Sequence, residues 1–148
     1  KYAEAEQQFR AAVAADPKDA QAHFALGSAL MEQKKYAESQ QELLAALKLK
    51  PDLQEAYGNL AVVAAANKDY QLAIRALDVR AKVQPETPAT YFLRATSFDN
   101  LKAIPQAVEY YQRFLSVDNG KLPDQEWQAR HRLVALDPKN REKYLKTK

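Results

Sequence analysis

The stretch from residue 20 to residue 51 reads AQAHFALGSALMEQKKYAESQQELLAALKLKP, and a near copy, QEAYGNLAVVAAANKDYQLAIRALDVRAKVQP, follows from residue 54 to residue 85. Residues that end these units recur at an interval of 34 residues, at Pro17, Pro51, Pro85 and Asn119. Self-similarity at a fixed period of this length is typical of helical repeat arrays. The sequence therefore predicts an all-α repeat protein.

Each copy contains two amphipathic segments separated by a short polar break. In the first copy, Ala20–Gln33 places apolar residues at spacings of three and four, and Tyr36–Leu49 resumes the pattern after Lys34 and Lys35. Pro51 ends the unit, because proline cannot extend the helical hydrogen-bond ladder and disfavours helix in the residue before it. Two helices joined by so short a linker must lie antiparallel.

The period predicts a single array of repeats over residues 1–148. We expect the second helix of a truncated repeat, three complete repeats and a capping segment, over 1–19, 20–53, 54–87, 88–121 and 122–148. Because Tyr2–Ala15 lacks a partner helix and a preceding cap, we expect it to leave an apolar flank uncovered and the sequence to begin inside a longer protein. After Gly120 the period slips, and Trp127 is expected to anchor the terminal helix onto the fourth repeat.

Composition restricts the kinds of site that the chain can hold. Hydrophobic residues make up 47% of the 148 residues and charged residues 28%, which indicates a folded rather than a disordered chain. Cysteine is absent, so disulfides, thiolate metal sites and cysteine nucleophiles are excluded. This absence fits a reducing cytosol and a periplasm equally well, so the compartment stays open. No apolar run approaches the roughly 20 residues needed to span a bilayer.

The units resemble the tetratricopeptide repeat of bacterial proteins, whose 34-residue pattern has a large residue and Leu-Gly in its first helix. Small residues and an aromatic follow in the second helix, and a proline closes the repeat. The second repeat fills these positions with His23, Leu26, Gly27, Leu30, Tyr36, Ser39, Leu43, Ala46 and Pro51. The third has Tyr57, Leu60, Ala61, Ala64, Tyr70, Ala73, Leu77, Arg80 and Pro85. The fourth has Tyr91, Arg94, Ala95, Phe98, Ile104, Ala107, Tyr111, Phe114 and Asn119.

The resemblance implies a right-handed superhelical solenoid whose first helices line a concave groove. Such domains bind peptide segments or partner helices of other proteins, and they are neither enzymes nor cofactor carriers by themselves. The groove positions of the family fall here on Gln21, Phe24, Ala25, Ser28, Met31, Glu55, Gly58, Asn59, Val62, Ala65, Ala66, Phe92, Leu93, Thr96, Asp99 and Asn100. This lining is mostly small, apolar or uncharged, so the hypothesis is a groove for an apolar or amphipathic segment. The alternative is that Phe24 and Phe92 only pack between neighbouring helices.

Some members of the family hold the C-terminal carboxylate of chaperones with groove cations, which make charge-assisted hydrogen bonds to it. Of those positions only Asn59 matches here, and Phe24, Ser28, Ala89 and Leu93 occupy the others. A chaperone-tail adaptor is therefore disfavoured.

Two arginines stand where the repeat usually has packing residues. A guanidinium inside a packed interface needs a partner, because an unpaired buried charge is costly. We therefore expect Arg80 or Arg94 to pair with Asp78 or Asp99 between the third and fourth repeats. His23, at the large-residue position of its repeat, is expected to be a packing residue.

Two other interpretations stay open beside a groove for a partner of unknown identity. The net charge of +3 gathers at the C-terminal end, so an anionic ligand or nucleic acid is the alternative, although aromatic residues are scarce among these cations. They are Lys121, Arg130, Arg132, Lys139, Arg141, Lys143, Lys146 and Lys148. The other interpretation is a homodimer through the bare face of Tyr2–Ala15. We expect no catalytic residues and no metal site, because the sequence has no nucleophile with its base, metal cluster or phosphate loop.

Overall fold

The computed structural model describes residues 1–146, which form nine α-helices and one short 3₁₀ helix. The chain divides into two compact units, Lys1–Val83 and Gln84–Lys148, here called the N-terminal and C-terminal units. The single array expected over 1–148 stays a prediction, and each unit is described by itself.

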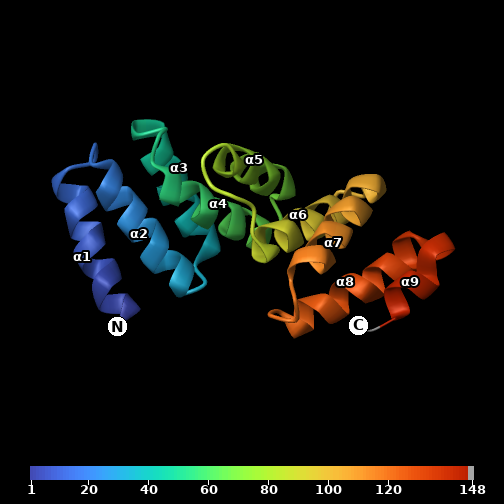
Figure 1. Cartoon of the computed structure of the whole chain (residues 1–148). Helices are drawn as coiled ribbons and strands as arrows, with labels where there is room; N and C mark the ends of the chain where they lie inside the picture. The colour runs from blue at the N-terminus through green and yellow to red at the C-terminus, as the bar shows by residue number, and fades with distance from the viewer. Residues whose placement is uncertain (147–148) are drawn as a thin grey trace. The chain divides into compact units, whose positions relative to one another are not determined.

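The N-terminal unit consists of five helices, in which two antiparallel pairs follow a single helix (Figure 1). Their bounds are α1 (Tyr2–Ala15), α2 (Ala20–Glu32), α3 (Tyr36–Leu49), α4 (Gln54–Ala66) and α5 (Tyr70–Ala81). Helix α2 packs against α3 and α4 against α5, while α1 packs against α2 and α3 against α4. The helices expected from the 34-residue period are all present, and α5 ends two residues earlier than the sequence pattern indicates.

The C-terminal unit pairs α6 with α7, and α8 and α9 then follow in turn. Their bounds are α6 (Pro88–Asn100), α7 (Ile104–Val117), α8 (Pro123–Leu136), the 3₁₀ helix (Pro138–Asn140) and α9 (Arg141–Leu145). The prediction that Trp127 anchors α8 is wrong, because its side chain is 62% exposed. Ala129 and Leu133 of α8 and Tyr144 of α9 enter the core instead. Trp127 lies two residues before Ala129, so the helical rotation turns it away from the face that packs.

The turn between the helices of each pair has the same backbone geometry, repeated at 34-residue intervals. Lys34, Lys68 and Lys102 have φ values of 59°, 63° and 61°, in the left-handed region. Each lysine N–H, and the N–H of the next residue, bonds back into the preceding helix, as Lys34 does to Met31 and Lys35 to Leu30, both at 2.9 Å. This is the Schellman helix ending, which satisfies the last carbonyls and reverses the chain in three residues.

Close contact between α2 and α3 holds the first pair together. A Cβ added to Gly27 would lie 2.9 Å from Leu43 Cγ, so the absence of a side chain lets the helices approach. The Ser39 hydroxyl donates a hydrogen bond to the Gly27 carbonyl at 2.6 Å. Ser39 and Leu43 are completely buried by this packing.

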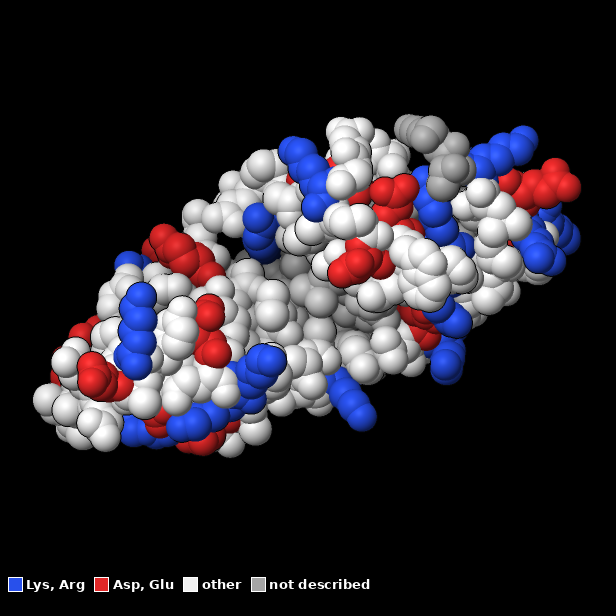
Figure 2. Space-filling view, turned by 90° about the horizontal axis from the view of Figure 1, so that it is seen from below, with Lys and Arg blue, Asp and Glu red and all other residues white. Residues whose placement is uncertain are grey.

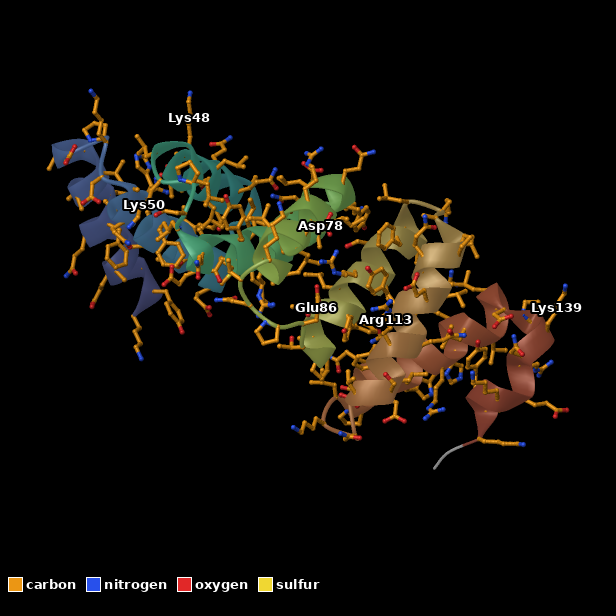
Figure 3. All side chains as sticks on the ribbon, turned by 45° about the horizontal axis from the view of Figure 1, so that its top comes forward. Lys48, Lys50, Asp78, Glu86, Arg113 and Lys139 are labelled. Carbon is orange, nitrogen blue, oxygen red and sulfur yellow. The ribbon has the colours of Figure 1, made fainter. Side chains whose placement is uncertain are left out.

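In the C-terminal unit, an ion pair joins buried Arg94 of α6 to the segment just before this helix. Arg94 is only 4% exposed, and its Nε and Nη2 donate to Glu86 Oε1 at 3.0 and 2.8 Å. Glu86 lies just before α6 (Figure 3). Arg94 therefore has the carboxylate partner that the sequence analysis expected an arginine here to need, and this partner is Glu86 of the same unit. Asp99, one of the two expected partners, binds Arg132 instead. A pairing of either arginine with Asp78 stays a prediction.

His23 links α2 to α3 through Nδ1, and to the turn that precedes α2 through Nε2. Burial by itself would lower the pKa of His23. The Glu42 carboxylate, 2.6 Å from Nδ1, and the Pro17 carbonyl, 2.8 Å from Nε2, both favour the charged imidazolium and raise the pKa above its ordinary value. His23 is therefore the half-buried packing residue expected from the sequence, and it also forms an ion pair when protonated.

This pair makes the stability of the N-terminal unit depend on pH. Because the pKa is higher in the folded than in the unfolded chain, the contribution is complete below about pH 6.5 and is lost as the pH rises through the folded pKa. We expect the free energy of unfolding, measured with urea between pH 5.5 and 8.5, to fall with pH in the wild type and to stay flatter in His23→Gln. Equal slopes in the wild type and in His23→Gln would contradict the assignment.

The left-handed lysines predict a stabilising glycine substitution. A side chain in this conformation costs about 1–2 kcal/mol, and glycine escapes the cost while losing more backbone entropy. Lys68→Gly should therefore raise the free energy of unfolding by about 0.5–1 kcal/mol in a thermal or urea melt. Lys48→Gly is the matched control, because Lys48 is an exposed residue in the last turn of α3 and projects away from the ribbon (Figure 3). There glycine should destabilise by about 1 kcal/mol; destabilisation by both variants would refute the strain argument.

Candidate functional site

In the N-terminal unit, the predicted groove residues form two stripes along α2 and α4. Residues spaced by three and four share one face of a helix, as Glu55, Asn59, Val62 and Ala66 do on α4. Asn59 Nδ2 donates to Ser28 Oγ at 3.0 Å and so joins this stripe to that of α2. Val62 is 50% exposed, and Glu55 and Ala66 are also exposed.

A hollow of about 440 Å³ lies between α1 and α2, and its lining is mostly apolar. This α1–α2 hollow is lined by Tyr2, Ala5, Phe9, Gln21, Phe24, Ala25, Ser28, Ala29 and Glu32. It brings together four predicted groove residues, Gln21, Phe24, Ala25 and Ser28, whereas Met31 lies outside the lining. Sequence reasoning did not place Tyr2 and Phe9 in the site, although it did predict an uncovered apolar flank on their helix.

The next repeat along the chain, formed by α2 and α3, shows what fills the equivalent space there. Ser39 and Leu43 of α3 are the counterparts of Ala5 and Phe9, and both are completely buried in contact with Gly27 of α2. Ala5 and Phe9 are only half-buried, and Tyr2 is 47% exposed. The α1–α2 hollow beside α1 therefore corresponds to the place that α2 fills beside α3.

Polar contacts hold α1 in place beside this hollow. Glu6 accepts hydrogen bonds from Lys35 Nζ at 2.8 Å, Arg10 Nε at 2.9 Å and Gln33 Nε2 at 2.7 Å. Lys35, followed by Arg10 and Gln33, lowers the pKa of Glu6 to about 2. Arg10 also binds Glu38 of α3 at 2.7 Å. The apolar lining is thus presented by a helix that ion pairs fix to its neighbours.

In the C-terminal unit, the predicted groove residues of α6 take part in packing and in an ion-pair network. The Phe92 ring lies 5.2 Å from that of Phe114, between centroids, and so contacts the core. Thr96 donates its hydroxyl hydrogen to the Phe92 carbonyl at 3.1 Å, and Leu93 is half-buried. The role of these residues as ligand contacts stays a prediction.

Asp99 is 7% exposed and lies at the centre of the network. Arg132 Nε and Nη2 donate to its two oxygens at 2.7 and 2.8 Å, and the Tyr111 hydroxyl donates at 3.1 Å. The Arg132 hydrogen bonds lower the pKa of Asp99. Burial, and then the Asp99 charge, raise the pKa of Tyr111. Asp99 is therefore an ionised carboxylate whose charge is already compensated.

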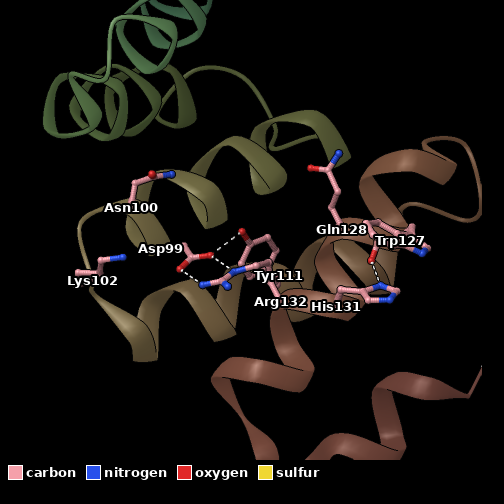
Figure 4. Close-up of a pocket in the computed structure, with 8 residues that line it drawn as sticks. All are labelled: Asp99, Asn100, Lys102, Tyr111, Trp127, Gln128, His131 and Arg132. Carbon is pink, nitrogen blue, oxygen red and sulfur yellow. Dashed lines mark hydrogen bonds and ion pairs between the residues drawn. The ribbon is translucent and has the colours of Figure 1, made fainter.

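A second hollow, of about 380 Å³, opens beside this network, and Figure 4 shows the side chains around it. This α6–α8 hollow is lined by Asp99, Asn100, Lys102, Tyr111, Trp127, Gln128, His131 and Arg132. The sequence predicted only Asp99 and Asn100 as groove residues. The contribution of α8 was missed because the period slips after Gly120, so the repeat pattern no longer indicates which face of α8 is open.

The basic C-terminal segment is partly neutralised by its own carboxylates. Arg130 pairs with Glu126 at 2.8 Å, and Arg132 pairs with Asp99. Lys139, at the 3₁₀ helix (Figure 3), contributes to a further hollow of about 600 Å³. That hollow is lined by Pro138, Lys139, Asn140, Arg141, Glu142, Lys143 and Lys146. Lys148 lies outside the described residues. On the face drawn in Figure 2, acidic and basic side chains are interspersed rather than gathered by sign.

Two kinds of feature are absent from the part of the chain that the structure describes. Among residues 1–146, no group of three or more His, Asp or Glu side chains is placed to hold a metal ion. Within the same residues, no helix has the length and apolar character needed to cross a membrane.

The chain matches a known protein family in sequence and several solved structures in fold. A family model described as "Tetratricopeptide repeat" matches residues 1–53 and 30–82. The structure of MamA (residues 41 to the end) from Desulfovibrio magneticus RS-1 aligns with a TM-score of 0.83 and 18% identity, over 97% of this chain and 79% of that chain. YrrB, described as "a TPR protein with an unusual peptide-binding site", aligns with a TM-score of 0.59 and 16% identity, over 88% and 75%. No curated protein matches. The expected fold class, an all-α solenoid, is confirmed.

Proposed function

The chain belongs to the tetratricopeptide-repeat family, and from this premise we propose that it is a non-catalytic protein-interaction scaffold whose α1–α2 hollow receives an amphipathic helix. The observation that carries the proposal is the apolar α1–α2 hollow, whose lining includes four of the residues predicted from the sequence. The description of YrrB as a peptide-binding TPR protein supports the same class of function.

The packing of α2 onto α3 supplies a template for the partner helix. Gly27 lets α2 approach Leu43 closely, and Leu26 and Leu30 beside it are buried. The partner should likewise carry a glycine or alanine opposite Phe9, with leucine-sized residues one position before it and three after it. Such a helix would lie with its apolar face in a groove, which is a common mode of helix recognition.

Apolar burial is the source of affinity in this proposal. Covering an aromatic side chain contributes about 1.5–3 kcal/mol, and the hollow offers Phe9 and Phe24 as half-buried rings. Among the lining residues only Glu32 carries a charge. Binding should therefore depend weakly on ionic strength, in contrast to binding through the basic C-terminal segment.

The test uses a fluorescein-labelled helical peptide with the sequence of α2, stapled on its outer face. Fluorescence anisotropy should show saturable binding, and Phe9→Glu should weaken it at least tenfold, because the substitution places a charge in the apolar hollow. Val62→Glu is the matched control: Val62 is exposed on α4 outside the lining, so its variant should bind like the wild type.

Circular dichroism of each variant separates loss of binding from loss of fold. Phe9→Ala serves as the second variant, because it removes the ring without adding a charge. Equal affinity in Phe9→Ala, Phe9→Glu and the wild type would overturn the proposal. So would sedimentation that shows a dimer of the wild type converted to a monomer by Phe9→Glu, since a second copy would then be the occupant.

A further inference from the structure

Another hollow, of about 400 Å³, lies in the C-terminal unit between α7 and α9, which follow and precede each other around α8 (Figure 1). This α7–α9 hollow is lined by Gln112, Leu115, Ser116, Arg130, Lys143, Tyr144 and Lys146. Its surface is mostly apolar, because the stems of lysine and arginine and the ring of tyrosine present carbon atoms to it. It shares no residue with the α1–α2 hollow, so a site here is independent of the function proposed above.

Hydrogen bonds fix the walls of the α7–α9 hollow. Gln112 Nε2 donates to the Tyr144 hydroxyl at 2.6 Å, and that hydroxyl donates to Asp137 at 2.5 Å. Arg130 Nη1 donates to the carbonyls of Tyr144 and Lys146 at 3.1 and 3.3 Å, and so holds the end of α9 against α8. The hollow is therefore preformed, and a ligand need not order its walls.

Two lysines give this hollow a positive rim. Lys143 and Lys146 are exposed, and neither forms an ion pair within the part of the chain that the structure describes. Arg130, the third cation of the lining, is paired with Glu126 at 2.8 Å. The Lys143 charge also acts on Asp137, which lies outside the lining and is hydrogen-bonded to neutral side chains. The lining itself contains no carboxylate for either lysine.

The positive charge continues beyond this rim. Lys143 and Lys146 also line the hollow of about 600 Å³ around the 3₁₀ helix, where Lys139 and Arg141 join them. Glu142 is the single acidic residue of that lining, which therefore carries a net charge of +3. Because the two hollows share these lysines, an apolar space borders a basic surface. A surface of this kind attracts acidic segments and repels basic ones.

We propose that the α7–α9 hollow binds an acidic segment of a partner protein, in which one leucine or phenylalanine stands between carboxylates. The apolar side chain enters the hollow beside Leu115 and Tyr144, and the carboxylates next to it pair with Lys143 and Lys146. Both lysines line the same hollow, so one short segment reaches both of them. The apolar residue matches the lining, and the carboxylates match the rim.

The same observations disfavour other anionic ligands. Single-stranded nucleic acid needs exposed rings on which its bases stack, whereas Tyr144, the aromatic residue of the lining, is only 2% exposed. An anionic membrane takes up apolar side chains that protrude, and within residues 138–146 only Leu145 is a large apolar residue that does so. An acidic protein segment uses both the hollow and its rim.

The probe is a fluorescein-labelled peptide in which one phenylalanine stands between three glutamates on each side. It is titrated into the whole protein at low salt, and fluorescence anisotropy should show saturable binding. Replacing the glutamates by glutamines should weaken binding at least fivefold, and replacing the phenylalanine by alanine should do the same. Added salt should weaken binding of the glutamate peptide and leave that of the glutamine peptide unchanged.

Lys143→Met combined with Lys146→Met should weaken binding of the glutamate peptide at least fivefold and leave binding of the glutamine peptide unchanged, because methionine keeps an apolar stem. Leu115→Ala should weaken binding of both peptides, since it removes apolar surface from the hollow. Lys121→Met is the matched control: Lys121 is exposed in the same unit and lines neither hollow, so its variant should bind like the wild type. Circular dichroism checks the fold of each variant.

The proposal is overturned if no peptide binds, if the glutamate and glutamine peptides bind equally, or if the double lysine variant binds the glutamate peptide like the wild type. It is also overturned if oligothymidylate or phosphatidylserine vesicles displace the probe at lower concentration than the unlabelled peptide does. The double lysine variant should bind the stapled α2 peptide like the wild type, so failure of this site is distinguishable from failure of the α1–α2 site.

Discussion

Close approach of two helices at a small residue is the contact on which each helix pair depends. Gly27 in α2 has its counterpart 34 residues later in Ala61 of α4 and again in Ala95 of α6, and all three are buried. The facing positions hold Leu43 in α3 and Tyr111 in α7, which are also buried. Since side chains at this point must interlock, a larger residue in the first helix would force the pair apart. A small buried residue thus recurs at this position of the first helix every 34 residues, in step with the sequence period.

The backbone conformation of the turns lets the two helices of each pair lie antiparallel. Lys34, Lys68 and Lys102 all adopt the left-handed conformation, which lysine does not favour. The Schellman hydrogen bonds and the packing of the following helix hold each of them there. The strained turn is thus a consequence of antiparallel packing, and Lys102 shows that the same turn can also present a cation beside a hollow.

The α1–α2 and α6–α8 hollows differ because different kinds of side chain line them. In the N-terminal unit, α1 presents the face that α3 buries under α2, so half-buried Phe9 and Phe24 line an apolar space. In the C-terminal unit, α8 follows a shifted period and brings Arg132 to Asp99, which gives a polar hollow with an exposed Trp127.

The sequence by itself determined the helices, their antiparallel pairing and the packing positions, because helix periodicity, proline stops and a 34-residue repeat depend on local geometry. It also indicated Phe24, Ala25 and Ser28 as residues of a surface. Only the tertiary structure decided that Trp127 faces outward and that Asp99 binds Arg132, 33 residues later in the chain. Those outcomes depend on the rotation of α8 about its axis, and one or two residues of slip change that rotation by 100° per residue.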